Sequence, residues 1–407
     1  MQEKNDTKSY DFYYKTCITD LHCPCGINNN IAADCWYENH KKQEYKLPNW
    51  LKSYDIKCPF DRCNLYKGSH GITSYIYTGN PEDPLVSIIL KYIITFHGFN
   101  ASLSAFNNLR CSLNNSKFSV LSFDLYGHGL SSSPKYKYYS ENYSLEFFAK
   151  QLRELLIFLR LETKSATLIG MSMGCCIAAK YCYMYPQSVD KLIFLSPAGH
   201  ITDIPYRIKM IKNCSCITPV AGCFFWPICF KRRGCKKNSM WERTMWMLFV
   251  KKRGPLGIMA CVNRIPLWNC LDLYQQIGEF HKPTLLLWGK CDKVIPIKVS
   301  YDFQKALKNS LLVKFDDCGH LLLSDKPMET ICTCIAFLNI QYTKSSQINV
   351  TKFRNWLPFD ENGHYIHKLS RSIDYSVDED TDELNLPSNQ ILVTIDEYEN
   401  DIKFPDM

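Results

Sequence analysis

Residues 170–174 read G-x-S-x-G and stand between an apolar run and a pattern of small, helix-forming residues. The apolar run 166–169 predicts a buried strand, and residues 175–179 predict the beginning of a helix. So short a turn between strand and helix crowds the backbone, and the glycines on both sides of Ser172 relieve the crowding. A chain with this segment is expected to hold Ser172 at the end of a strand, beside a helix N-terminus. The motif alone is also compatible with an ordinary strand-to-helix turn.

Two polar residues follow at places where a nucleophilic serine would need them. A serine hydroxyl is a weak nucleophile until a base, usually histidine, takes its proton, and the histidine needs a carboxylate to orient it. Residues 284–288 predict a buried strand with Asp292 in the loop beyond it, and residues 311–315 predict another with His320 beyond it. The C-terminal ends of parallel strands meet at one edge of a sheet. Ser172, Asp292 and His320 are therefore expected to lie together.

Backbone donors for a developing oxyanion are expected after an earlier strand. Residues 92–96 predict that strand, and His97 and Gly98 follow it. The N–H of Phe99 can then combine with the N–H of Met173, the residue after the proposed nucleophile. His97 is expected to hold this turn through hydrogen bonds of its side chain.

Four motifs in this order resemble the α/β-hydrolase family of serine esterases and lipases. They are residues 97–98, the D-x-x-G-x-G-x-S stretch at residues 124–131, the Ser172 turn, and the strand–loop pairs that carry Asp292 and His320. The Ser172 turn and the Gly-His-Gly sequence at residues 127–129 are similar to those of monoacylglycerol lipases, lysophospholipases and related carboxylesterases. The resemblance implies an α/β-hydrolase fold: a mostly parallel, doubly wound sheet with an inserted lid. It also implies catalysis by the serine, acid and histidine without cofactor or metal.

The resemblance also assigns roles among the acidic residues. The family places its acid after the earlier of the two strands, which favours Asp292 over Asp316 and Asp317. The chain order of the triad makes Asp124 and His128 structural rather than catalytic, because both precede the serine.

Length and composition agree with one α/β core that carries extensions. The chain has 407 residues, of which 46% are hydrophobic. We assign the ranges as follows: 1–66, an N-terminal extension; 67–200, the first part of the core; 201–281, the lid; 282–341, the second part of the core; 342–407, an acidic, flexible tail. Neither an apolar run of membrane-spanning length nor an N-terminal signal pattern is found, so a cytoplasmic protein, at most peripheral on membranes, is expected.

The lid is strongly basic. Residues 203–253 contain twelve Lys/Arg and two Asp/Glu, a balance of +10, whereas residues 341–407 have a balance of −7. An aromatic centre at residues 224–226 stands between basic runs at 231–233 and 251–253, a pattern suited to an anionic membrane surface. The alternative is a lid that folds its aromatic side chains over the substrate pocket. Both imply an apolar substrate, and no recognition motif for nucleic acid accompanies the charge.

The chain has 21 cysteines, an odd number without a secretory signal, which argues against a disulfide framework. Those on predicted core elements are expected to be small buried hydrophobes: Cys175, Cys176, Cys182, Cys332 and Cys334. A zinc site is a weaker interpretation of the N-terminal set Cys17, His22, Cys23, Cys25, Cys35 and His40, because no C-x-x-C pair is present.

The sequence thus predicts a serine hydrolase that cleaves carboxylic esters, of the monoacylglycerol or lysophospholipid kind, through an acyl-enzyme. Ser172 is the nucleophile, His320 the base, Asp292 the acid, and Phe99 and Met173 supply the oxyanion donors. A thioesterase or acyltransferase with the same triad is an alternative, and so is a non-catalytic scaffold that binds membranes.

Overall fold

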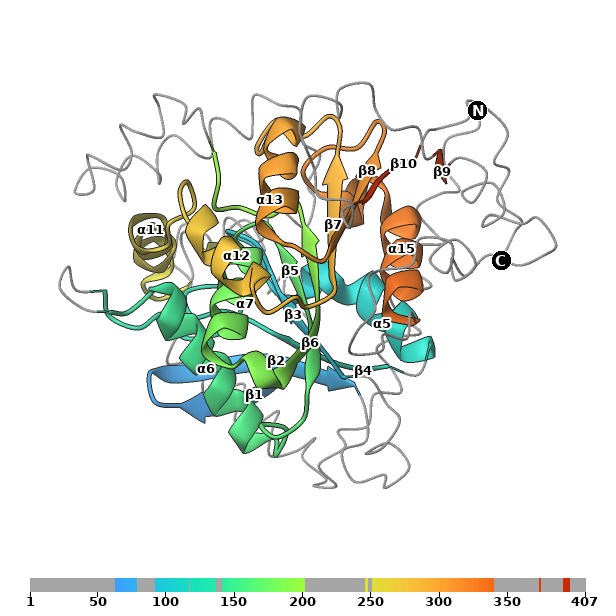
Figure 1. Ribbon diagram of the computed structural model, residues 1–407. Coiled ribbons are helices and arrows are strands. Elements are labelled where there is room, and N and C mark those ends of the chain that lie inside the picture. Colours follow the sequence, from blue (N-terminus) through green and yellow to red (C-terminus); the bar gives the residue numbers. More distant parts are fainter. Residues whose placement is uncertain are drawn as a thin grey trace, which may run out of the picture.

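A mostly parallel sheet runs through the part of the chain that the structure describes. The computed structural model describes residues 63–78, 92–116, 118–136, 141–201, 246–247 and 251–339, with the backbone of 373–374 and 391–395. The strands lie in the order β1-β2-β4-β3-β5-β6-β7-β8-β10-β9 (Figure 1). Their bounds are β1 Asn64–Gly68, β2 Gly71–Thr78, β3 Tyr92–Phe96, β4 Ser119–Phe123, β5 Ala166–Met171, β6 Val189–Leu195, β7 Thr284–Gly289, β8 Ser310–Phe315, β9 Ile373–Asp374 and β10 Ile391–Ile395.

The strands from β4 to β10 in this order are parallel, and β1, β2 and β9 pair antiparallel near the two edges. Strands β3, β4, β5, β7 and β8 are buried at every position, which explains why they read as near-continuous apolar runs. The doubly wound α/β-hydrolase sheet expected from the sequence is therefore confirmed. The chain passes from β3 to β4 on one side and continues with β5 on the other, so the strand order reverses between β3 and β5. Sites of open α/β sheets form at such a point.

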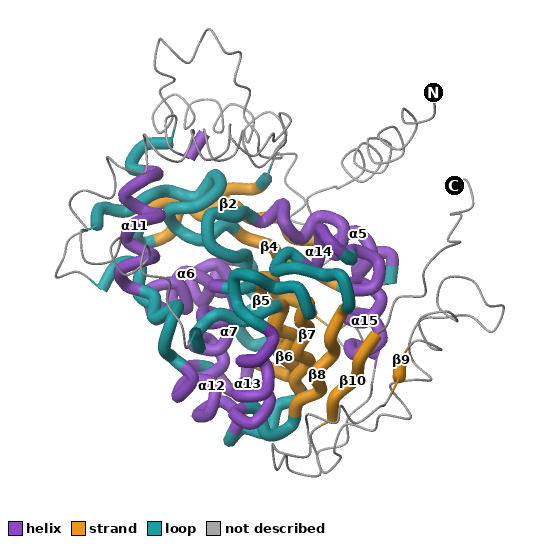
Figure 2. The backbone as a smooth tube through the Cα atoms, turned by 90° about the horizontal axis from the view of Figure 1, so that it is seen from above, coloured by secondary structure: helices purple, strands orange, loops and turns teal. Residues whose placement is uncertain are grey.

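Helices cover both faces of the sheet (Figures 1 and 2). One face carries α6 Leu145–Phe158, α7 Met173–Met184, α12 Leu271–Gly278 and α13 Ser300–Ala306, and the other carries α5 Asn107–Asn115, α14 Leu322–Asp325 and α15 Pro327–Asn339. Short 3-10 turns lie at Leu103–Phe106, Pro186–Ser188 and Ile297–Val299, and α11 spans Gly254–Arg264. Helix α6 begins after Ser144, whose Oγ accepts the Phe147 N–H at 3.1 Å.

Two hydrophobic cores follow from the two layers. The first packs α6, α7 and α12 on the sheet and includes Phe148, Cys176 and Tyr274. The second packs α5 and α15 on the opposite face and includes Leu109 and Phe337. The five cysteines expected in the core are buried. The N-terminal cysteines and histidines considered for zinc lie outside the described residues.

Parts of the predicted extensions and lid are described. Strand β1 comes from the end of the N-terminal extension, and β9 and β10 come from the acidic tail, where β10 pairs parallel with β8. Helix α12, within the range assigned to the lid, packs against α7 and α13 in the layer that covers the sheet. The aromatic centre at 224–226 and the basic run at 231–233 lie outside the described residues. Within the described ranges, no helix has the length and apolar character needed to cross a membrane.

The contact between α7 and β3 leads to a prediction about stability. A Cβ atom on Gly174 would lie 2.1 Å from the Phe96 carbonyl oxygen. Glycine to alanine inside a helix normally raises helix stability by about 1 kcal/mol. Here the collision should reverse the sign, so that Gly174→Ala lowers the free energy of unfolding by about 1–3 kcal/mol. Urea denaturation of both proteins measures this, and an unchanged or higher stability would contradict the close contact.

Candidate active site

The Ser172 turn has a strained backbone that its neighbours hold in place. Ser172 has φ 52° and ψ −118°, outside the regions that L residues usually occupy. Its N–H donates to the Leu195 carbonyl at 2.9 Å, and its carbonyl accepts the N–H groups of Cys175 at 3.0 Å and Ala198 at 3.2 Å. Such strain persists only where the surroundings determine the conformation, which is common at functional sites. The turn stands between β5 and α7, as the sequence predicted.

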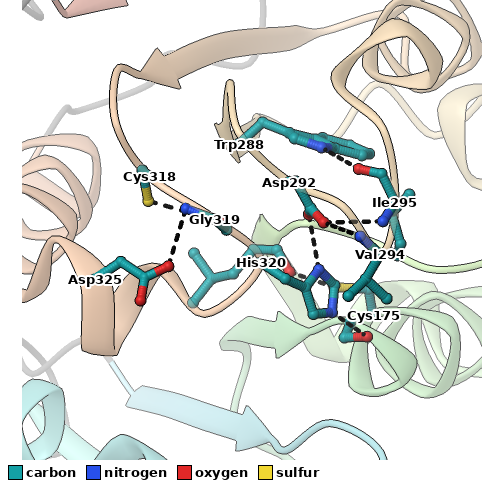
Figure 3. A network of polar contacts seen from close by, with 11 residues as sticks. Cys175, Trp288, Asp292, Val294, Ile295, Cys318, Gly319, His320 and Asp325 are labelled. Carbon is teal, nitrogen blue, oxygen red and sulfur yellow. Dashed lines mark hydrogen bonds and ion pairs between the residues drawn. The ribbon is translucent and has the colours of Figure 1, made fainter. Parts of the chain in front are cut away.

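A chain of hydrogen bonds joins the three predicted residues, and Figure 3 labels two of them, Asp292 and His320. His320 Nε2 lies 3.0 Å from Ser172 Oγ, and His320 Nδ1 lies 2.7 Å from Asp292 Oδ2. The other carboxylate oxygen of Asp292 accepts the N–H groups of Val294 at 2.8 Å and Ile295 at 2.9 Å. Residues from three separate loops thus meet beyond the C-terminal ends of β5, β7 and β8.

The geometry decides which nitrogen of His320 carries the proton. The Asp292 side chain is fully buried, and its ionised carboxylate only accepts hydrogen bonds. His320 Nδ1 therefore donates, and Nε2 is left to accept the hydroxyl proton of Ser172. The two other candidate acids lie elsewhere: Asp316 Oδ1 is 2.7 Å from Lys290 Nζ, and Asp317 is exposed.

The turn at residues 97–100, called the oxyanion turn here after its predicted role, lies against Ser172. A Cβ atom on Gly98 would be 3.4 Å from Ser172 Cβ, so the two backbones are in close contact. His97 Nδ1 donates to the Gly98 carbonyl at 2.8 Å, and His97 Nε2 accepts the Leu125 N–H at 3.0 Å. The side chain thus holds the turn that contains Phe99. Met173 is the first residue of α7, where the helix leaves backbone donors without intrahelical partners.

Asp124 organises the loop behind this turn, residues 124–131. Its carboxylate accepts the N–H of Leu103 at 2.7 Å and that of Leu130 at 2.8 Å, and it also accepts the Ser74 hydroxyl. Gly129, at φ +45°, lies so close that any Cβ would collide with the Asp124 carboxylate. Asp124 therefore connects separate segments around the site without contacting His320.

Two buried imidazoles lie side by side between the 124–131 loop and the oxyanion turn. The rings of His97 and His128 are 5.1 Å apart, and both side chains are fully buried. Burial lowers the pKa of His97, and burial with the neighbouring His97 and Lys251 lowers the pKa of His128 well below its usual range. Asp124 acts in the opposite direction on the pKa of His97. Both rings are neutral at physiological pH, as the acceptor role of His97 Nε2 requires.

Cysteines near the triad are not thiolates. Burial raises the pKa of the Cys175 thiol well above its usual range and that of Cys318 to about 12. A thiol is a nucleophile only after deprotonation. Among the described groups next to His320, the Ser172 hydroxyl is thus the one suited to attack.

Lys251 belongs to the basic run 251–253, whose sequence pattern suits an anionic membrane surface, but it is buried. Lys251 is 5% exposed, and its ammonium donates to the carbonyls of His128 at 2.8 Å and Gly129 at 2.7 Å, and to that of Ser131. It is therefore not part of any surface. Five apolar residues at 246–250 precede it, and they are the sequence signal that indicates burial.

Comparisons with known proteins agree with this architecture. Residues 89–327, more than half of the chain, match the family model described as serine aminopeptidase, S33. A protein of Mycobacterium tuberculosis described as uncharacterized is 33% identical over 261 residues, which are 59% of this chain and 72% of that protein.

Monoacylglycerol lipase ABHD6 of mouse is 25% identical over 221 residues, 49% of this chain and 63% of the lipase. The chain thus spans less than two thirds of that relative. A solved thermophilic esterase from Thermogutta terrifontis shares the fold with a TM-score of 0.52 at 20% identity, covering 68% of this chain and 98% of its own. A solved structure of a putative lipase from Acinetobacter baumannii has a TM-score of 0.54 at 20% identity. The match covers 68% of this chain and 90% of the lipase chain.

The buried neutral state of His128 predicts a dependence of stability on pH. Because its folded pKa lies below the ordinary value of about 6.5, the unfolded chain binds more protons as the pH falls below that value. The contribution of the neutral ring to the free energy of unfolding is complete above about pH 6.5. It is lost on acidification, by up to about 1.4 kcal/mol per pH unit for each such histidine. His128→Gln should therefore flatten the slope between pH 7 and 5. Urea unfolding at several pH values tests this, and parallel curves for both proteins would contradict it.

Proposed function

The chain belongs to the serine aminopeptidase S33 family of α/β-hydrolases, and on this premise we propose that it is a serine hydrolase of carboxylic esters with an apolar acyl chain. The observation that carries the proposal is the continuous chain of hydrogen bonds from Ser172 through His320 to Asp292. A hydroxyl, a base and an orienting carboxylate in this arrangement perform acyl transfer on several unrelated folds.

The first half of the proposed reaction forms the acyl-enzyme. Ser172 Oγ attacks the ester carbonyl carbon while His320 Nε2 takes the hydroxyl proton. The buried Asp292 carboxylate keeps His320 in the reactive tautomer and stabilises the imidazolium. The Phe99 and Met173 N–H groups would bind the oxyanion, and each such donor is worth about 3–4 kcal/mol of transition-state stabilisation. The C–O bond then breaks, and His320 passes its proton to the leaving alcohol.

The second half releases the acid. Water attacks the acyl carbon, His320 Nε2 accepts its proton, and the bond to Ser172 Oγ breaks with return of the proton to the serine. Burial lowers the pKa of His97, and the neutral ring retains the Nε2 lone pair that accepts the Leu125 N–H beside the oxyanion turn.

An apolar substrate is supported by the side chains that flank the triad. Val294 and Leu321, next to Asp292 and His320 in the chain, are 58% and 41% exposed. Large apolar side chains exposed beside reactive groups suit an acyl chain that leaves water. The likeness to monoacylglycerol lipase ABHD6 extends this proposal to a monoacylglycerol or lysophospholipid.

Other reactions use the same triad. A thioesterase or an acyltransferase would form the same acyl-enzyme, and the peptidase name of the family model adds amide hydrolysis. A panel of p-nitrophenyl esters, acyl thioesters, aminoacyl p-nitroanilides and monoacylglycerols of graded chain length separates them. Highest kcat/KM on the long-chain oxygen esters is expected, and highest kcat/KM on the anilides would replace the proposal with a peptidase.

Ser172→Ala tests the nucleophile. Removing the hydroxyl should lower kcat on a short p-nitrophenyl ester by about 10⁴–10⁶-fold and abolish labelling by a fluorophosphonate probe. Ser165→Ala is the matched control. Ser165 lies just before β5, at the opposite end of that strand from Ser172, and its hydroxyl donates to the Asp190 carboxylate. Undiminished hydrolysis by folded Ser172→Ala would overturn the mechanism, and a silent wild-type protein would favour the scaffold alternative.

Asp292→Asn tests the acid. Loss of the orienting carboxylate should lower kcat by about 10⁴-fold. Asp317→Asn should change kcat less than twofold, because Asp317 is exposed and asparagine tolerates its positive φ of 43°. Full activity of Asp292→Asn with loss in Asp317→Asn would reverse the assignment.

We further propose that the basic lid binds an anionic membrane surface. Lys251 is buried and is therefore not one of the basic residues that would contact the membrane. Reversing Lys231, Arg232 and Arg233 to Glu should weaken binding to anionic vesicles, since each cation near such a surface contributes about 1 kcal/mol. Binding should also fall with salt, because the Debye length is about 8 Å at 0.15 M. Vesicle co-sedimentation measures both effects. Equal binding to neutral and anionic vesicles would leave the lid as a cover of the pocket.

A further inference from the structure

Lys251 is a buried cation in a place built to hold one. Its ammonium donates to three backbone carbonyls of the 124–131 loop, those of His128, Gly129 and Ser131. An ammonium has three N–H donors, so this set can satisfy all of them. Removing a lysine from water is unfavourable unless its charge is compensated in this way. So complete a set of acceptors indicates a specific role for the cation rather than incidental burial.

The loop that Lys251 holds is in direct contact with the oxyanion turn. The Leu125 N–H donates to His97 Nε2 at 3.0 Å, and His97 Nδ1 donates to the Gly98 carbonyl at 2.8 Å. The His128 ring also lies edge-on to Phe99, with ring centroids 6.3 Å apart. Two independent contacts thus connect the loop to the residues that precede and carry the proposed oxyanion donor.

The charge of Lys251 acts on the same two imidazoles. It lowers the pKa of both His97 and His128, alongside the larger effect of burial, whereas Asp124 raises that of His97. A protonated His97 would lose the Nε2 lone pair that accepts the Leu125 N–H. The ammonium therefore favours the protonation state in which the loop and the turn stay connected.

We propose that Lys251 is a positioning residue of the hydrolase site: by binding three carbonyls of the 124–131 loop it holds His97 and Phe99, and with them the oxyanion turn. Lys251 contacts neither Ser172 nor the proposed site of the acyl carbon through these bonds. Its effect is indirect and should be largest in the transition state, when the oxyanion forms. The proposal rests on the proposed serine-hydrolase function.

The chain supplies a matched control in Lys191. This lysine is 8% exposed, and its ammonium donates to the carbonyls of Phe337 at 3.2 Å and Leu338 at 3.0 Å, near the end of α15. It lies near the beginning of β6, whereas Ser172 binds Leu195 at the end of that strand. Both Lys251→Met and Lys191→Met remove a buried ammonium from backbone carbonyls, so both should lower stability. Only the first should change the chemistry.

The test compares kinetics with the binding of two inhibitors in the full-length protein. The substrate is p-nitrophenyl butyrate. An alkyl trifluoromethyl ketone, which forms a tetrahedral oxyanion adduct, is paired with the alcohol of the same chain length, which does not. Lys251→Met should lower kcat by about 10- to 100-fold and leave KM within twofold of the wild-type value. This loss is smaller than the loss of up to about 10³-fold that follows deletion of an oxyanion donor itself. Affinity for the ketone should fall by the same factor as kcat/KM, and affinity for the alcohol should not change.

Lys191→Met should keep kcat and ketone affinity within twofold of the wild-type values. Lys251→Arg, which retains the charge and the N–H donors, should lower kcat less than Lys251→Met does. If Lys251→Met does not fold, Lys251→Arg is used in its place. Unchanged ketone affinity in a folded Lys251 variant, or equal losses in Lys251→Met and Lys191→Met, would overturn the proposal. If the wild-type protein neither hydrolyses the ester nor labels with a fluorophosphonate, the proposed function fails and this inference fails with it.

Discussion

The backbone conformation at Ser172 is the constraint on which the site depends. A φ of 52° reverses the chain between β5 and α7 within one residue, and the Ser172 N–H binds the Leu195 carbonyl to keep it there. The reversal presses α7 so close to β3 that Gly174 has no room for a side chain. Gly98 also packs closely against Met171 and Ser172, so the turn at residues 97–100 lies beside the proposed nucleophile.

Behind this turn the site is held by charges rather than by apolar packing alone. The 124–131 loop is bound from two sides: the Asp124 carboxylate takes backbone N–H groups, and the Lys251 ammonium takes backbone carbonyls. Opposite charges that bind opposite ends of peptide dipoles fix a loop that contains two glycines and has few conformational preferences of its own. Neutral His97 connects this loop to Gly98, because its Nε2 accepts the Leu125 N–H and its Nδ1 donates to the Gly98 carbonyl.

Much of the fold could be predicted because the central strands are buried on both faces. The apolar runs at 92–96 and 284–288 correspond to β3 Tyr92–Phe96 and β7 Thr284–Gly289. Such runs leave little doubt about their environment, because both alternating faces must leave water. The burial of Lys251 could not be predicted in this way. A charge next to two others in sequence predicts a solvated surface, and only the fold shows that three carbonyls converge on this one.

The sequence by itself determined the order of the elements and the loops that carry Ser172, Asp292 and His320. Local pattern suffices there, because strand, turn and helix each depend on neighbouring residues. The tertiary structure decided which of the nearby carboxylates contacts His320, with Asp292 Oδ2 at 2.7 Å from its Nδ1. It also decided that Lys251 lies inside, bound to a loop more than a hundred residues earlier. Both depend on distances between segments far apart in the chain, which no local pattern records.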